Sequence, residues 1–137
     1  MEATHLLDTS VYSQVLRPKP NQACIGRWEN LGDQAICVSS ICIGELEFGL
    51  ELKDSEKLWA RYRQILLGRF VVVDFDARVA SVFARIKAQQ QRIGKPVDDF
   101  DLSIAACAVT YDLTLVTLNA RHFSLIDGLT WEDWSQP

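Results

Sequence analysis

Histidine and paired cysteines are scarce in this sequence. There are only two histidines, His5 and His122, and no two cysteines stand at a CxxC spacing. The ligand pattern of a zinc site is therefore missing. We interpret the cysteines as reduced, mostly buried apolar groups of a cytoplasmic protein. The four cysteines are Cys24, Cys37, Cys42 and Cys107.

The sequence also lacks long apolar runs. It has no uninterrupted apolar stretch of membrane length, and no basic region followed by an apolar run near its start. Proline is rare, and its one concentration, Arg17-Pro18-Lys19-Pro20, predicts a loop between two short helices. We see no repeat or linker, so the 137 residues predict a single domain, residues 1–137, without a membrane partner.

An excess of positive charge is absent as well. The net charge is −4, whereas a protein that binds nucleic acid by general electrostatics should be basic. An enzyme that brings cations to its site can be acidic, because bound metal ions supply local positive charge.

Four short apolar segments have the character of buried strands. They alternate with helical patterns, which predicts an α/β fold with a central, mainly parallel sheet flanked by helices. One helical stripe carries Leu58, Tyr62, Ile65 and Leu66. A second carries Val79, Val82, Phe83, Ile86 and Ile93, with Asp76 as its expected N-cap. The predicted strands are Thr4–Leu7, Ala35–Val38, Phe70–Val73 and Thr114–Thr117.

Ligands of such sheets bind outside the carboxyl ends of the strands, and Asp8 directly follows the first predicted strand. A helix N-cap is the plainer interpretation of Asp8, with Thr9 and Ser10 as alternative caps. A catalytic role is the other interpretation.

Glu45 and Asp101 are acids on helix faces that otherwise look buried. The face of Glu45 includes Ile41, Cys42, Phe48, Gly49 and Leu52, while Glu47 and Glu51 should point to solvent. Asp101 shares a face with Ile104, Ala105 and Ala108. A carboxylate in an apolar stripe needs a compensating salt bridge or a metal ion.

If the three acids converge, divalent cations would neutralise their repulsion. Oxygen ligands suit Mg²⁺, and that chemistry suits hydrolysis of a phosphodiester. After the fourth strand, Asn119 is either a helix cap or part of the site, and we expect His122 to be a surface residue rather than a ligand.

Five segments, in order along almost the whole chain, resemble the PIN-domain nucleases, and within them the VapC-like toxins of prokaryotic toxin–antitoxin pairs. They are LLDTS, SSICIGELEFGL, GKPVDDFDLSIAACA, LTLVTLNARHF and GLTWEDW. The resemblance implies a PIN-like, Rossmann-like three-layer fold with its acids at the carboxyl edge of the sheet.

The resemblance also implies Mg²⁺- or Mn²⁺-dependent cleavage of structured RNA, homodimerisation and inhibition by a cognate small antitoxin. The acids Asp8, Glu45 and Asp101 match the family's catalytic and metal-binding positions. Asn119 stands where many members carry a fourth acid. The polar residues Thr9, Ser10 and Thr117 match positions that order the acids or the metal-bound water.

Other functions are compatible with strand-end acids. A phosphatase with a nucleophilic Asp usually carries a second Asp two residues later, where this chain has Ser10. A PIN nuclease of RNA processing, or a weakly catalytic PIN module that binds RNA or a partner, stays an alternative. The basic residues Arg85, Lys87, Arg92 and Lys95 are either phosphate contacts or the solvated face of a helix.

Overall fold

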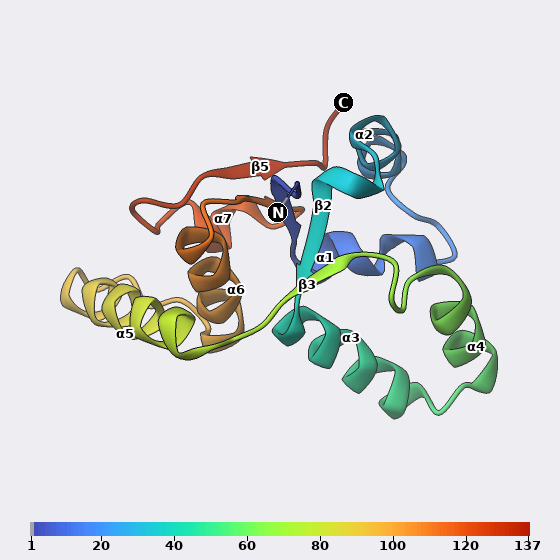
Figure 1. Cartoon of the computed structure of the whole chain (residues 1–137), viewed down its shortest axis with the longest axis horizontal. Helices are drawn as coiled ribbons and strands as arrows, with labels where there is room; N and C mark the ends of the chain where they lie inside the picture. The colour runs from blue at the N-terminus through green and yellow to red at the C-terminus, as the bar shows by residue number, and fades with distance from the viewer. Residues whose placement is uncertain (1) are drawn as a thin grey trace.

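The computed structural model describes residues 2–137, and its centre is a five-stranded sheet in which every neighbouring pair is parallel. The strand order is β3-β2-β1-β4-β5, so the first strand is central (Figure 1). The strands are β1 (His5–Leu7), β2 (Ile36–Ser39), β3 (Val71–Val73), β4 (Thr114–Thr117) and β5 (Trp131–Asp133).

Helices connect the strands and surround the sheet. In Figure 1, α5 and α6 lie to the left of the sheet, while α3 and α4 extend to the lower right. The α-helices are α1 (Thr9–Tyr12), α2 (Gln22–Leu31), α3 (Ser40–Lys53), α4 (Glu56–Ile65), α5 (Ala77–Arg92), α6 (Asp99–Thr110) and α7 (Ala120–Phe123). Two 3-10 helices, η1 (Ser13–Leu16) and η2 (Asp33–Ala35), complete the chain.

Short polar side chains start most of these helices. Asp76 accepts a hydrogen bond from the backbone N–H of Val79, which confirms its predicted role as the N-cap of α5. Such caps satisfy N–H groups that have no partner within the helix. The same role is taken by Asp8 for α1, Asn21 for α2, Ser39 for α3, Ser55 for α4 and Asp98 for α6.

The core lies between the sheet and helices with small or apolar inner faces. In α6 the run from Leu102 to Ala108 is buried, and its alanines allow this helix to approach the sheet closely. α5 packs against α6, and α3 also contacts α6. These contacts place the start of α6 beside the first turns of α3, at one end of the sheet.

The fold class and all four predicted strands are confirmed, with small differences in their bounds. β1 and β3 each start one residue later than predicted, β2 is shifted by one residue, and β4 matches. The predicted Arg17–Pro20 loop does separate η1 from α2. All four cysteines are free and buried, as expected.

Three features differ from the sequence-based expectation. β5 was missed, because Trp131, Glu132 and Asp133 form no apolar run. β3 was expected to be buried on both faces, but Val71 and Val72 are exposed because β3 is an edge strand. Ile93 was assigned to the buried stripe of α5, yet it lies at the exposed C-cap of that helix.

The strand order places a topological switch point between β1 and β4. From β1 the chain builds β2 and β3 on one side, then returns to build β4 and β5 on the other. The connections that leave β1 and β4 therefore diverge and open a crevice at the carboxyl ends of these two strands, where such sheets bind their ligands. No helix within residues 2–137 is long and apolar enough to cross a membrane.

Candidate active site

The Asp8 carboxylate occupies this switch point, directly after β1. Only 4% of the residue is exposed. Its Oδ1 accepts hydrogen bonds from the Ser10 hydroxyl, at 2.6 Å, and from the Val11 backbone N–H, at 3.0 Å. Its Oδ2 accepts a hydrogen bond of 2.6 Å from the hydroxyl of Thr117, the last residue of β4. The cap interpretation of Asp8 is thus confirmed, and the carboxylate is held both from α1 and from the end of β4.

The two hydroxyls that hold Asp8 are themselves held by backbone groups of the β4–α7 connection. Ser10 Oγ accepts from the N–H of Leu118 at 3.0 Å, and Thr117 Oγ1 accepts from the N–H of Asn119 at 2.8 Å. Each hydroxyl therefore accepts from the backbone and donates to the carboxylate, so its proton direction is set. This network explains why small hydroxyl residues stand at both positions.

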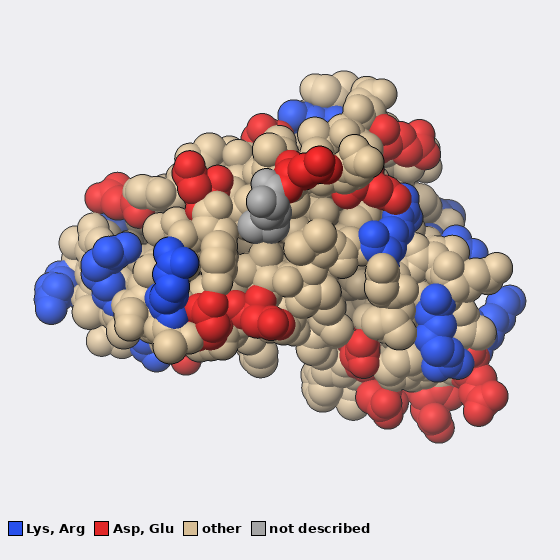
Figure 2. Space-filling view, in the orientation of Figure 1, with Lys and Arg blue, Asp and Glu red and all other residues tan. Residues whose placement is uncertain are grey.

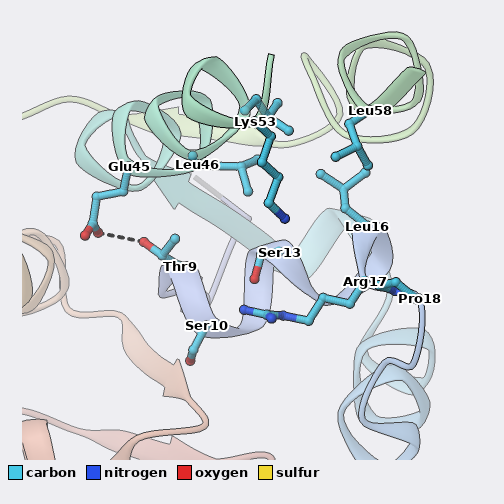
Figure 3. Close-up of a pocket in the computed structure, with 12 residues that line it drawn as sticks. Thr9, Ser10, Ser13, Leu16, Arg17, Pro18, Glu45, Leu46, Lys53 and Leu58 are labelled. Carbon is cyan, nitrogen blue, oxygen red and sulfur yellow. Dashed lines mark hydrogen bonds between the residues drawn. The ribbon is translucent and has the colours of Figure 1, made fainter. Parts of the chain in front are cut away.

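Glu45 projects toward the same end of the sheet from the second turn of α3. It accepts a hydrogen bond of 2.7 Å from the Thr9 hydroxyl, which links α3 to α1 (Figure 3). The prediction that Glu45 lies on a buried apolar face is wrong in part, since Phe48 is 63% exposed and Leu52 is 70% exposed. The buried face of α3 is instead formed by Cys42, Leu46 and Leu50, so Glu45 lies at the border of that face.

Glu47 was expected to be solvated, and this expectation is also wrong. Its carboxylate accepts a hydrogen bond of 2.8 Å from the hydroxyl of Tyr62 in α4. The periodicity of α3 predicted a solvent-exposed face at Glu47, but Tyr62 of α4 lies against that side of the helix.

Asp101 reaches the site from the first turn of α6. Ile104, Ala105 and Ala108, its predicted neighbours on one face, are all buried, and the Asp101 side chain itself is half-buried. Its Oδ2 lies 3.1 Å from Nδ1 of His122 in α7. His122 is partly exposed, as expected, but its contact with Asp101 had no signal in the sequence because it joins residues of two separate helices.

The pKa values of two of these acids are raised. Burial is the main cause of the raised pKa of Asp8, opposed by the hydrogen bonds from Ser10, Thr117 and Val11 and reinforced by the charge of Asp101. Burial also raises the pKa of Asp101, where His122 opposes it and the charges of Asp98 and Glu45 add to it. The charge of Asp101 thus acts on Asp8, and the charge of Glu45 acts on Asp101.

The donor set fits a hard divalent cation. It consists of carboxylate oxygens, and among residues 2–137 no Lys or Arg forms an ion pair with Asp8 or Glu45. Within the same residues, no three acidic, His or Cys side chains are close enough to hold one ion together. Repulsion between like charges, and the contact of Asp101 with His122, account for that separation.

Asn119 lies at the N-cap position of α7, but its side chain makes no capping hydrogen bond. Its interpretation as a side-chain cap is therefore wrong. Asn119 is exposed. Its backbone N–H donates to the Thr117 hydroxyl, which in turn donates to Asp8, so the residue lies next to the hydrogen-bond network of Asp8.

Comparison with known proteins agrees with this geometry. The family model described as PIN domain matches residues 5–129. This chain belongs to the PIN-domain family. The matched PIN segment includes Asp8, Glu45, Asp101 and Asn119, and so every acid of the cluster lies within it.

Relatives place this PIN-domain chain among the VapC and FitB ribonuclease toxins of toxin–antitoxin systems. It is 34% identical to the tRNA(fMet)-specific endonuclease VapC of Shigella flexneri over 130 residues, which are 95% of this chain and 97% of that protein. It is 32% identical to toxin FitB of Neisseria gonorrhoeae, with 94% of this chain and 97% of that protein covered.

Solved structures show the same fold. FitAcB from Neisseria gonorrhoeae superposes with a TM-score of 0.88 at 30% identity, over 96% of this chain and 98% of that chain. DNA-bound VapBC from Salmonella typhimurium gives a TM-score of 0.85 at 33% identity, again over 96% and 98%.

Burial of Asp8 predicts a measurable dependence of stability on pH. Because its pKa is raised in the folded PIN domain, the unfolded chain releases the proton first as the pH rises. The free energy of unfolding should therefore fall from about pH 4, the ordinary value for Asp, up through the raised pKa. In EDTA, Asp8→Asn should weaken this fall, leaving the contribution from Asp101, whose pKa is also raised.

Urea unfolding between pH 4 and pH 7 measures this effect. Asp127→Asn, which removes a charge from an exposed position, serves as the matched control and should keep the wild-type profile. A metal-free Asp8→Asn variant less stable than the wild type at pH 7 would mean that the hydrogen bonds to the carboxylate outweigh the cost of burying it.

Proposed function

We propose that this chain hydrolyses phosphodiester bonds of structured RNA with Mg²⁺ or Mn²⁺ held by Asp8, Glu45 and Asp101. The observation that carries the proposal is Asp8 itself, a buried carboxylate beside two further carboxylates and without an ion pair to Lys or Arg among residues 2–137. Burial of such a charge is costly unless a cation compensates it. Membership of the VapC group supports the choice of RNA.

A bound ion would supply positive charge to the scissile phosphate and would acidify an attacking water. The protein's own part is to position the carboxylates. Ser10 and Thr117 fix both oxygens of Asp8, and Thr9 fixes one oxygen of Glu45. Asp101 is the adjustable member, because it must leave His122 to approach the other two acids. These hydroxyl contacts are the outer-shell supports typical of metal sites.

The proposal assigns one PIN domain to residues 1–137 and places its action in the cytoplasm, which suits four reduced thiols. The region of α5 offers a second face for RNA, because Lys and Arg side chains gather at the left of Figure 2. Arg85, Arg92 and Lys95 are exposed there, whereas Lys87 forms an ion pair of 2.9 Å with Asp99. We also propose a homodimer, on the family resemblance.

A cognate small antitoxin would need to neutralise an acidic site. Apolar residues of α3 and α4 line a pocket that ends at Glu45, namely Leu46, Leu50 and Leu58. We propose that an apolar segment of the antitoxin lies along this groove and extends an Arg or Lys to the carboxylates. Such a cation would pair with them and exclude the metal ion.

The carboxylate variants Asp8→Asn, Glu45→Gln and Asp101→Asn should each reduce RNA cleavage at least about 100-fold, because each removes one charged oxygen ligand. Glu51→Gln, an exposed change on the same helix as Glu45, should leave activity unchanged. Purified protein, labelled RNA and added Mn²⁺ provide the assay, with circular dichroism to confirm folding. Near-normal cleavage by any of the three variants would remove that carboxylate from the proposed site.

Asn119→Asp should strengthen the metal site, because Asn119 is exposed at its edge and stands where a fourth acid is common in the family. Cleavage by the variant should saturate at a Mg²⁺ or Mn²⁺ concentration several-fold lower than the wild type needs. Asp127→Asn, which changes the charge elsewhere, controls for general electrostatics. An unchanged metal titration would place Asn119 outside the site.

The antitoxin mechanism predicts that the chain alone arrests growth and that co-expression of its antitoxin restores growth. Replacing the inserted Arg or Lys of the antitoxin by Ala should weaken inhibition of cleavage more than it weakens binding, since the groove contacts persist. Calorimetry and the cleavage assay measure the two effects. An antitoxin that binds far from the three acids and leaves the site loaded with metal would contradict the mechanism.

A further inference from the structure

Two pockets, each of about 330 Å³, are lined in part by the proposed metal-binding acids. The first is lined by Thr9, Ser10 and Glu45 at the end nearest the cluster. The second is lined by Asp101 and His122. Each pocket thus includes one of the proposed metal-binding acids, Glu45 in the first and Asp101 in the second, so an ion bound between these acids would lie between the two pockets.

The first pocket carries two cations at its far end. Figure 3 shows the side chains of Arg17 and Lys53 extending into it from η1's C-terminal side and from the end of α3. Within the described chain neither side chain takes part in an ion pair, and Glu45 is the only acid in the pocket lining. Their positive charges are therefore directed at the pocket and available to an anionic ligand.

The second pocket also carries a cation, although two acids, Asp98 and Asp101, line it. Arg121 lines it beside Asp101, is exposed, and has no ion-pair partner among residues 2–137. Positive charge thus stands in both pockets beside the carboxylates. In a chain of net charge −4, this placement of cations around one site is not expected from composition.

We propose that Arg17 and Lys53 on one side, and Arg121 on the other, hold the phosphates that flank the scissile phosphate of an RNA strand. The inference rests on the proposed function, because a divalent ion at the carboxylates would turn the negative centre positive and make the two pockets and this centre together attractive to a polyanion. Without the ion the carboxylates repel the scissile phosphate, but the contacts of the three cations with the flanking phosphates remain. Phosphate contacts of this kind set the register of the strand without selecting its bases.

An acidic peptide is the weaker ligand for these three cations. One acidic side chain of a peptide could pair with Arg17 or Lys53. The same peptide would also need a cation to face the metal-free carboxylates and a second acid to reach Arg121. An RNA strand carries its charge at every nucleotide, so it matches all three positions of the metal-loaded site without any special sequence.

The test compares two double variants of equal charge. Arg17→Gln with Lys53→Gln removes the cations of the first pocket. Lys19→Gln with Lys57→Gln removes two exposed cations from the same loop and from α4, neither of which lines that pocket. Equilibrium binding of a labelled single-stranded oligoribonucleotide is measured in EDTA over a range of salt concentrations, and cleavage kinetics are measured with Mn²⁺.

The Arg17/Lys53 variant should bind RNA with a log–log salt slope smaller by about 1.4, since each single-strand phosphate contact contributes about 0.7. Its KM should rise roughly 10-fold while kcat stays within about twofold, as expected for lost uniform binding. Arg121→Gln should lower the slope by about 0.7. The Lys19/Lys57 variant should stay close to the wild type in both measurements.

Two outcomes would overturn the inference. One is an Arg17/Lys53 variant whose salt slope and KM equal those of the Lys19/Lys57 variant. The other is a variant that loses affinity for the antitoxin while its RNA binding is unchanged, which would assign the pocket to a protein partner. Failure of the proposed function is a separate result, because a wild-type protein that cleaves no RNA can still be tested for the salt slope of binding.

Discussion

The carboxylate of Asp8, buried at the end of the central strand, is the constraint on which the rest of the site depends. A charge in that position must be given hydrogen bonds from every side, and three donors supply them: Ser10, Val11 and Thr117. Two of these lie in the helix that follows β1, and the third ends β4. The same bonds that make the charge tolerable therefore join the two strands at the crevice and fix the direction of each carboxylate oxygen.

Hydrogen bonds reduce the cost of burying Asp8 but do not cancel it, since its pKa stays raised. The charge of Asp101 adds to that cost rather than relieving it. An arrangement that stores unfavourable charge at the ligand-binding edge of a sheet is typical of a functional site, where stability is given up for binding. The cation that would relieve it is the cofactor proposed for the reaction, so metal affinity and metal-free instability have the same origin.

Charge also organises the surroundings of the acids. Arg17, Lys53 and Arg121 line the two adjoining pockets, although the protein as a whole is acidic. The apolar walls contributed by α3 and α4 lie in the first of these pockets. An RNA strand and an inhibitory partner would then compete for one surface, which gives a physical basis for inhibition that does not require a conformational change.

The sequence by itself determined the fold class, four of five strands and the cap of α5, because these depend on local periodicity and on the residue that follows each strand. For the same reason it singled out the three acids of the proposed site. It did not reveal β5, whose Trp131-Glu132-Asp133 has no strand pattern and pairs only because β4 offers an open edge. It misplaced Phe48 and Glu47, because which face of α3 is covered depends on where α4 packs. Tertiary structure alone decided the contact of His122 with Asp101 and the presence of Arg17 and Lys53 in one pocket. In each case the two residues belong to elements that are far apart in the chain, so no local sequence pattern predicts that they lie together.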